Sequence, residues 1–248
     1  MTRSRNTIIF GSAGIVIGVI LIFSGIAFIF GGRDKSAPEQ EAVGKTVSAA
    51  GFSFLDLDKQ TRFSAGLRNR LRDALGNESI ESSTLIDLTT AHRGFLAAHF
   101  PDLDALNTQL NSDSGARIEH NIVKLMFRYA RRKNLPFDYV ELVFSNYTDL
   151  PLYFRIRTRG DSPNISATLE EKYGQPDRVI DSGALGSSLA WEKDGDVLIA
   201  SRVLNRLGVP EYQVMYYYTD HLNDLLATEI KLKKERTAAS RARGKAAF

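Results

Sequence analysis

Histidine is the side chain best suited to acid–base and metal chemistry near neutral pH, and this chain of 248 residues has four histidines and no cysteine. His92 and His99 lie in one stretch of helical spacing, where their separation of seven residues corresponds to about 10 Å along the helix axis. That distance is too long for two ligands of one metal ion. The sequence contains no zinc-site spacing, nucleophile elbow or complete phosphate-binding loop. We therefore expect no metal ion, no cofactor and no recognisable catalytic residue.

The other two histidines keep an enzymatic alternative open. His120 follows Glu119 directly, and His221 lies far along the chain. A fold that joined these three side chains in one pocket would supply the acid and base of an envelope enzyme without a recognisable motif. A filled core with the three side chains solvated would argue against it.

Basic charge is concentrated at the C-terminal end. Between Glu229 and Phe248 seven basic residues stand against two acidic ones, which leaves −2 for the rest of a chain whose total is +3. The basic residues of this tail are Lys231, Lys233, Lys234, Arg236, Arg241, Arg243 and Lys245. Because the folded part carries no such excess, we expect no nucleic-acid partner. The tail is a candidate for electrostatic attraction to anionic lipid headgroups, or it is a solvated end that aids solubility.

All of these groups are attached to a predicted membrane anchor over residues 7–30. This run of 24 residues contains no charged side chain, and as a helix it reaches roughly 36 Å, enough to cross a bilayer with some tilt. Residues 1–6 form a short basic head containing Arg3 and Arg5. The run is longer than the apolar region of a cleaved signal, so we expect an uncleaved signal-anchor.

Lysine and arginine are nearly balanced across the two ends of this span, so the positive-inside rule gives only a weak orientation. A short basic head on a first helix usually stays cytoplasmic. We therefore expect a cytoplasmic N-terminus and a C-terminal domain in the periplasm or outside the cell.

Glycines line one side of the predicted span. Gly11, Gly14, Gly18 and Gly25 fall within about 60° of one another on a helix, and two of them form a GxxxG pair that lets helices pack closely in lipid. The stripe predicts helix packing with a second copy of the chain or with a larger complex. The alternative is that glycine is simply common in membrane spans.

Beyond the anchor the pattern is first helical. Residues 31–51 are rich in small and charged side chains and predict a flexible linker. Apolar residues at helical spacing then predict helices from a cap at Asp58 to Gly76, over 83–99, after Pro101, and over 116–134. The cluster of Arg128, Arg131, Arg132 and Lys133 falls in the last turns of the fourth helix, where cations complement the helix dipole.

After Pro136 the period changes to that of strands. Alternation over 139–144 and 152–157 predicts a hairpin, and further strands are expected over 188–192, 197–203 and 212–218. Asp194 and Gly195 give a tight-turn signal between the middle pair. A short helix capped near Ser162 and closed at Gly174, and a last helix from about His221, complete the pattern.

The turn at Tyr173–Pro176, followed by a strand with Trp191, resembles small bacterial envelope modules of the outer-membrane assembly lipoprotein type. The cysteine on which those lipoproteins carry their lipid is missing, so we assign no family.

The sequence thus predicts an α+β chain: a single transmembrane helix, a helical section, and then an antiparallel sheet with helices packed on one face. The predicted segments are head 1–6, anchor 7–30, linker 31–51, helical section 52–134, α+β section 135–228 and basic tail 229–248. We expect a non-catalytic membrane-anchored envelope protein that binds membrane lipid and an unidentified protein partner, and that can form a homodimer through its span. A cytoplasm-facing accessory subunit of a membrane complex is the alternative, alongside the envelope enzyme.

Overall fold

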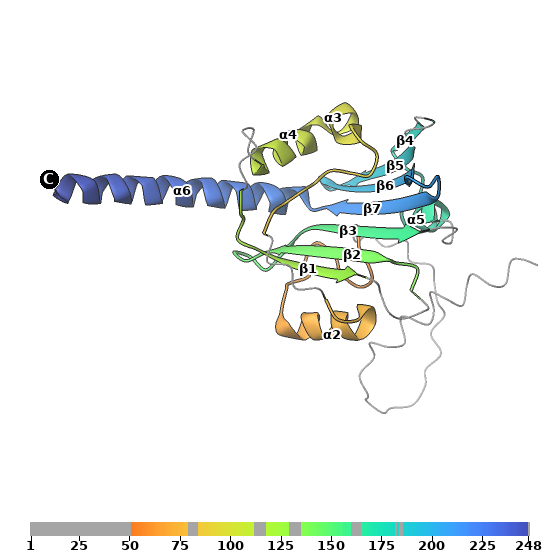
Figure 1. Ribbon diagram of the computed structural model, residues 1–248, viewed down its shortest axis with the longest axis horizontal. Helices are drawn as coiled ribbons and strands as arrows, with labels where there is room; N and C mark the ends of the chain where they lie inside the picture. The colour runs from red at the N-terminus through yellow and green to blue at the C-terminus, as the bar shows by residue number, and fades with distance from the viewer. Residues whose placement is uncertain are drawn as a thin grey trace, which may run out of the picture. The chain divides into compact units, whose positions relative to one another are not determined.

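The alternating and apolar runs of the second half pair into one antiparallel sheet of seven strands (Figure 1). The computed structural model describes residues 51–78, 84–111, 118–128, 135–159, 165–181, 183 and 186–247. The strands are β1 (Ile122–Arg128), β2 (Tyr139–Ser145), β3 (Pro151–Arg159), β4 (Arg178–Asp181), β5 (Ser187–Lys193), β6 (Asp196–Leu204) and β7 (Pro210–Tyr217). The five strands predicted from alternation are confirmed as β2, β3, β5, β6 and β7.

The strand order β1-β2-β3-β7-β6-β5-β4 consists of two meanders whose last strands, β3 and β7, lie side by side in the centre. The predicted tight turn between β5 and β6 is confirmed. Asp194 and Gly195 have φ angles of 51° and 81°, the left-handed values that a two-residue hairpin turn requires at both positions.

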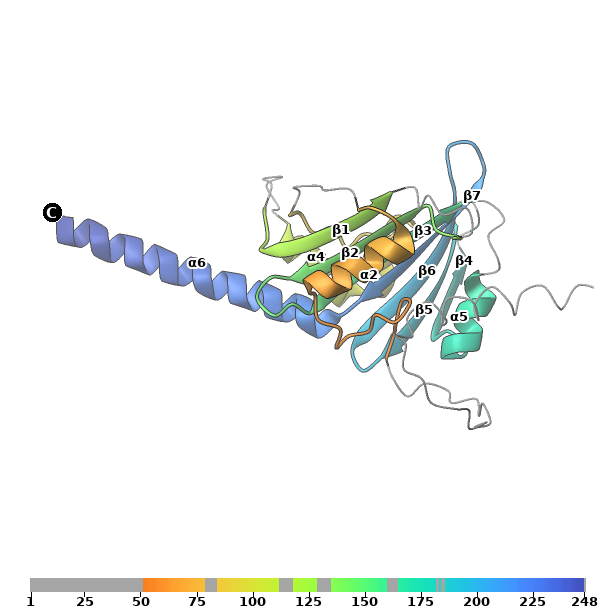
Figure 2. The same ribbon diagram turned by 90° about the horizontal axis from the view of Figure 1, so that it is seen from below.

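Helices cover both faces of this sheet, and the prediction of one covered face is wrong. On one face α2 (Ala65–Leu75) and α5 (Ile165–Tyr173) share a core with strand residues such as Phe144 and Trp191 (Figure 2). On the other face α3 (Phe95–His99), α4 (Pro101–Leu110) and the start of α6 (Thr219–Ala247) share a second core with residues such as Tyr153 and Met215. The domain therefore has three layers, helix, sheet and helix.

Two of the predicted helices in the first half are placed correctly. Ser64 caps α2 by accepting a hydrogen bond from Leu67 N at 3.1 Å, and Gly76, with a φ of 93°, ends it. The predicted cap at Asp58 is wrong, because its carboxylate accepts bonds from Gln60 and Thr61 in a turn before the helix. Proline opens α4, as predicted, and the helix buries three leucines: Leu103, Leu106 and Leu110.

The helices predicted over 83–99 and 116–134 are wrong. Among the described residues of the first stretch only Phe95–His99 is helical, and those of the second, 118–128, contain the strand β1, Ile122–Arg128. The strand is buried on both faces, with consecutive buried residues at Leu125, Met126 and Phe127. Its apolar residues Ile122, Leu125 and Met126, with Ile118 before them, also fall at helical spacing, so the period alone favours a helix.

Residues 84–94, which we call the crossing segment, run over the sheet on the face of α3 and α4. Lys124 of β1 donates to Leu85 O at 2.5 Å, and the hydroxyl of Tyr217 on β7 donates to Leu88 O at 2.6 Å. Farther on, His92 Nδ1 lies 2.9 Å from the Ser188 hydroxyl of β5. The segment has little secondary structure of its own, so the sheet positions it through side chains.

Helix α6 packs on the sheet with its first turns and then projects beyond it (Figure 1). Leu222 and Leu225 are buried, whereas nearly all residues from Lys231 to Arg243 are exposed. Glu229 fixes the junction by accepting bonds from Asn121 N at 3.0 Å and pairing with His120 at 2.7 Å. Within the described part of the chain, no helix is long and apolar enough to span a bilayer. The anchor predicted at 7–30 lies outside the described residues and stays a prediction.

Candidate functional site

A row of polar side chains crosses the sheet at the end opposite to α6. The strand register pairs Arg128 of β1 with Tyr139 of β2, Tyr139 with Arg157 of β3, and Arg157 with Gln213 of β7. Directly paired residues of neighbouring strands share a face. We call these four residues the outer row. They lie on the face that also carries the crossing segment.

One step inward along the same strands lies a second row, which we call the inner row: Met126, Glu141, Arg155 and Met215. Its carboxylate is buried, with 4% of the Glu141 side chain exposed, and it accepts bonds from two phenols. Tyr153 donates to Glu141 Oε1 at 2.7 Å, and Tyr139 donates to Oε2. Burial, aided by the charge of Glu141, raises the pKa of both phenols well above the ordinary value, so both remain donors.

Arg155 joins the inner row to the crossing segment. Its guanidinium lies 3.7 Å from Glu141 Oε1 and donates to the Asp87 carbonyl at 2.5 Å. The Asp87 carboxylate is 3.3 Å away. Burial opposes the ionisation of Asp87, but hydrogen bonds from Thr89 and the charge of Arg155 outweigh it and lower its pKa below 3.8. The charges of the inner row are thus paired within the protein.

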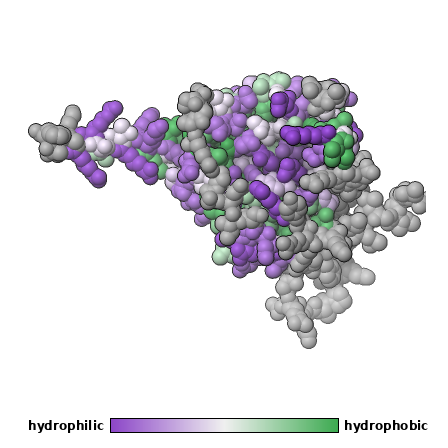
Figure 3. Space-filling view, viewed as in Figure 1, coloured by the Kyte–Doolittle hydropathy of each residue, from purple (hydrophilic) through white to green (hydrophobic). Residues whose placement is uncertain are grey.

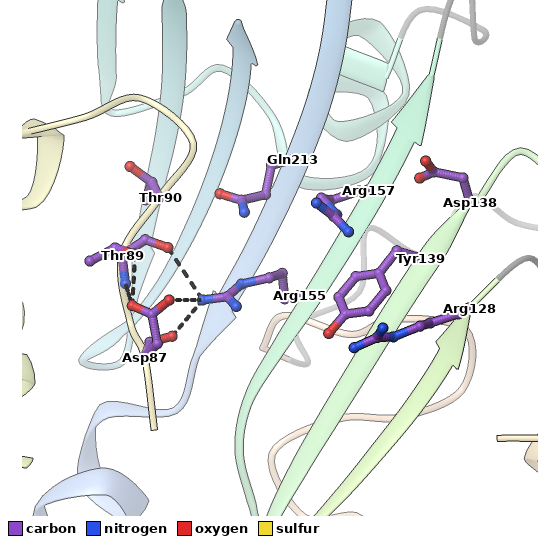
Figure 4. A pocket seen from close by; sticks show the side chains of 9 residues that line it. All are labelled: Asp87, Thr89, Thr90, Arg128, Asp138, Tyr139, Arg155, Arg157 and Gln213. Atoms are coloured by element: carbon purple, nitrogen blue, oxygen red, sulfur yellow. Dashed lines mark hydrogen bonds and ion pairs between the residues drawn. The ribbon is translucent and has the colours of Figure 1, made fainter. Parts of the chain in front are cut away.

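The outer row is more open at its two arginines, whereas Tyr139 and Gln213 are buried. Arg157 is exposed, and its guanidinium stacks over the Tyr139 ring at 4.5 Å from the ring centre. On its other side, Gln213 Oε1 accepts a bond from Ala91 N at 2.5 Å. Because a backbone N–H needs an oxygen acceptor, this bond fixes the amide orientation, and Gln213 Nε2 faces the pocket (Figure 4).

These side chains and the crossing segment enclose a pocket of about 350 Å³, at the small end of the range of ligand sites. Figure 4 shows the strand side chains on one side and the crossing segment on the other. The lining residues are Asp87, Thr89, Thr90, Arg128, Asp138, Tyr139, Arg155, Arg157 and Gln213. Three guanidinium groups face two carboxylates, and the remaining groups are neutral and polar. This arrangement suits an anionic group that is recognised by arginine and amide donors.

The register of the outer row continues into a closed part beneath the crossing segment. Gln213 pairs with Ser201 of β6, which pairs with Ser188 of β5. The two hydroxyls lie 2.9 Å apart, and His92 completes the chain of hydrogen bonds. Burial, with the charge of His99, lowers the pKa of His92 below 6.5. All three side chains are buried. Ser201 lines a smaller pocket of about 220 Å³, but Ser188 and His92 line neither pocket, so this serine–histidine pair gives a substrate no access.

The residues of the enzymatic alternative are not brought together in the pocket. His120 lies between Leu110 O at 2.8 Å and Glu229 at 2.7 Å, and Glu119 is exposed. His221 Nδ1 lies 2.8 Å from Pro151 O. Their partners tie them to the packing of α6, and none of them lines the pocket. Across the described residues, no group of three histidines or carboxylates is arranged to hold a metal ion.

The residues of the predicted electrostatic tail lie on the projecting part of α6. Lys231, Lys233, Lys234, Arg236, Arg241 and Arg243 are exposed, and the side chain of Lys245 is not described. Hydrophilic residues predominate along this part in the space-filling view (Figure 3). The described part of the tail is helical, as the last part of α6. The glycine stripe Gly11, Gly14, Gly18 and Gly25 lies outside the described residues.

The pocket was not predicted from the sequence. Arg128 was assigned to a helix end, and the structure places it on β1 in the outer row instead. One signal was present: arginines at 155 and 157 alternate along the strand predicted over 152–157, which puts them on one face. What they face depends on strand register and on the crossing segment, which the sequence pattern did not reveal. A comparison with protein-family models, curated proteins and solved structures found no match to this chain, so its function has to be inferred from its own geometry.

Proposed function

We propose that this protein is a membrane-anchored, non-catalytic binding module of the cell envelope, and that the pocket at the outer row receives an anionic group of its partner. The observation that carries the proposal is the exposed guanidinium of Arg157 at the mouth of a pocket with an oriented amide, Gln213. Arginine and amide donors recognise carboxylate and phosphate oxygens by paired hydrogen bonds.

The chemistry of the lining supports binding over catalysis. Its described residues include no histidine, serine or lysine, the usual bases and nucleophiles. The hydroxyl of Tyr139 already donates to Glu141, and its raised pKa keeps the proton on the oxygen. Asp87 is held as a carboxylate by Thr89 and Arg155. Each group is therefore equipped to hold a ligand in place.

The anchoring part of the proposal rests on the apolar run over residues 7–30. In this proposal the anchor holds the domain on the outer side of the membrane, where the basic half of α6 is attracted to anionic headgroups. The absence of native cysteine permits a direct test of the side. We expect a single cysteine at the exposed position Ser240 to react with a membrane-impermeant maleimide in intact cells. Labelling only after lysis would favour the cytoplasm-facing accessory subunit.

Anion binding is tested by the thermal stability of the full chain in detergent, with inorganic phosphate or sulfate exchanged for chloride at constant ionic strength. The fluorescence of Trp191, which is 3% exposed, reports unfolding. At ten times the dissociation constant, a bound anion stabilises the folded state by about 1.4 kcal/mol, a rise in Tm of about 3–5 °C.

The matched variants are Arg157→Gln in the pocket and Arg70→Gln on α2, an exposed arginine on the opposite face of the sheet. We expect the rise in Tm to disappear in the first variant and to persist in the second. An equal rise in both variants would reject the pocket as the anion site.

A further inference from the structure

The protein holds a piece of its own chain in the way that the pocket would hold a ligand. Arg155 binds the crossing segment by the Asp87 carbonyl at 2.5 Å and the Asp87 carboxylate at 3.3 Å. Four residues on, Ala91 N donates to the side-chain oxygen of Gln213. This face of the sheet therefore already recognises a non-helical segment through its acidic side chain, a carbonyl and an amide N–H.

Arg157 carries a second guanidinium on β3, two residues beyond Arg155 and on the same face of the sheet. Its guanidinium contacts the Tyr139 ring, and no ion pair joins it to any residue that the structure describes. The amide Nε2 of Gln213 is available on the neighbouring strand. The outer row thus repeats the guanidinium of the inner row and adds an amide donor, but its guanidinium has no acidic partner among the described residues.

We propose that the ligand of the pocket is an acidic peptide segment of a partner protein, bound in an extended conformation across the outer row beside the crossing segment. Arg157 takes an aspartate or glutamate side chain, and Gln213 donates to a backbone carbonyl. This assignment rests on the function proposed above, because it names the partner of the same pocket.

The charges and dimensions of the pocket favour a peptide over a phosphate group. Two carboxylates, Asp87 and Asp138, share the lining with the arginines, and they repel a dianion more than a single carboxylate. The neutral groups of Thr89, Thr90 and Gln213 match the donors and acceptors of a peptide backbone. From β1 to β7 the outer row crosses three strand intervals, roughly 14 Å, the length of about four extended residues.

The test is isothermal titration calorimetry, which measures the affinity of the full chain in nanodiscs for a blocked peptide, acetyl-Gly-Asp-Gly-Asp-Gly-amide. Its control is the same peptide with asparagine in place of aspartate. Since a hydrogen bond to a charged group contributes about 1.5–3 kcal/mol and each factor of ten is about 1.4 kcal/mol, we expect the acidic peptide to bind at least tenfold more tightly. Arg157→Gln should weaken it about tenfold, Arg157→Lys should restore part of the affinity, and Arg70→Gln should change nothing.

Inorganic phosphate and acetate, titrated in the same way, separate the two proposals. If they bind through Arg157 and the acidic peptide binds no more tightly than acetate, the peptide assignment is overturned and anion binding stands. If neither the small anions nor the peptide binds, both proposals fall. If the peptide binds equally well to the native chain and to Arg157→Gln, the site is elsewhere. Far-ultraviolet circular dichroism confirms that each variant is folded.

Discussion

The inner and outer rows run over the same strands and on the same face, one step apart, and yet their charged groups have different surroundings. In the inner row Arg155 is 14% exposed and has Glu141, Asp87 and Met215 as partners. In the outer row Arg157 is exposed and stacks on one aromatic ring. A buried charge must find partners within the protein because desolvation is costly. An exposed one keeps its donors for water or for a ligand.

The comparison indicates that the position of each arginine along β3 determines whether its guanidinium bonds within the protein or is exposed to a ligand. The crossing segment covers the inner row and supplies the carbonyls of Asp87 and Thr89 to Arg155. At the outer row it bonds to Gln213 through Ala91 N and forms one wall of the pocket, but it supplies no acidic partner to Arg157 among the described residues. We therefore assign the inner row to stability and the outer row to binding.

The largest expected effect is on stability. Replacing Arg155 by methionine leaves the Glu141 carboxylate buried without its cation and releases the crossing segment, so we expect a loss of about 2–4 kcal/mol. Arg157→Met removes an exposed stacking contact and should cost at most about 1 kcal/mol. Urea unfolding followed by Trp191 fluorescence measures both. Equal losses would mean that the two rows do not differ in their structural role.

The second effect is the coupling between Glu141 and its neighbours. Glu141→Gln keeps the shape of the side chain but weakens two charge-assisted bonds from phenols, and we expect a loss of about 1–2 kcal/mol. In a double-mutant cycle the coupling with Arg155 should exceed about 0.5 kcal/mol, and the coupling with Arg157 should be near zero. Stronger coupling to Arg157 would show that Arg157 belongs to the same network.

The buried cluster of His92, Ser188 and Ser201 predicts a smaller effect on stability, one that depends on pH. Since burial lowers the pKa of His92 in the folded state, the unfolded chain protonates first as pH falls below 6.5. Stability should therefore decrease on acidification from pH 6.5 down to the folded-state pKa. We expect urea unfolding of His92→Gln to show a flatter dependence over this range. An unchanged profile would contradict the assignment of His92 as a buried neutral group.

The smallest effect concerns Asp87. Its folded-state pKa lies below the ordinary 3.8, so its contribution to stability is present above pH 3.8 and is lost as pH falls through the lower value. Its side chain is 55% exposed, and solvent screening keeps the contribution below about 1 kcal/mol. Acid titration of the native chain and of Asp87→Asn, followed by circular dichroism, should differ only below pH 4. A difference near neutral pH would contradict this role.

The strands of the second half could be predicted because their turns and periods are local features. The Asp194–Gly195 turn and the alternation of β2 and β3 depend on nearby residues alone. The strand β1 could not be predicted, since its apolar residues Ile122, Leu125 and Met126 also fall at helical spacing. The helices on the second face of the sheet could not be predicted either, because the sequence pattern does not reveal which helices pack on which side.

The candidate site depends on contacts between residues far apart in sequence. Arg128, Tyr139, Arg157 and Gln213 become neighbours only through the register of four strands. The crossing segment, predicted as a helix, instead forms a wall of the pocket. The arginines at alternate positions of β3 were visible in the sequence, but the burial that separates Arg155 from Arg157 is a property of the tertiary structure.

The most direct test of this division is the nuclear magnetic resonance of the arginine side chains. The full chain, labelled with ¹⁵N-arginine and held in nanodiscs, is titrated with acetyl-Gly-Asp-Gly-Asp-Gly-amide, and the Nε–H signals are assigned by single substitutions. We expect the signal of Arg157 to move with saturation while those of Arg155 and Arg70 stay in place. Movement of Arg155 without Arg157, or no saturable movement in either row, would contradict the assignment of the outer row to ligand binding.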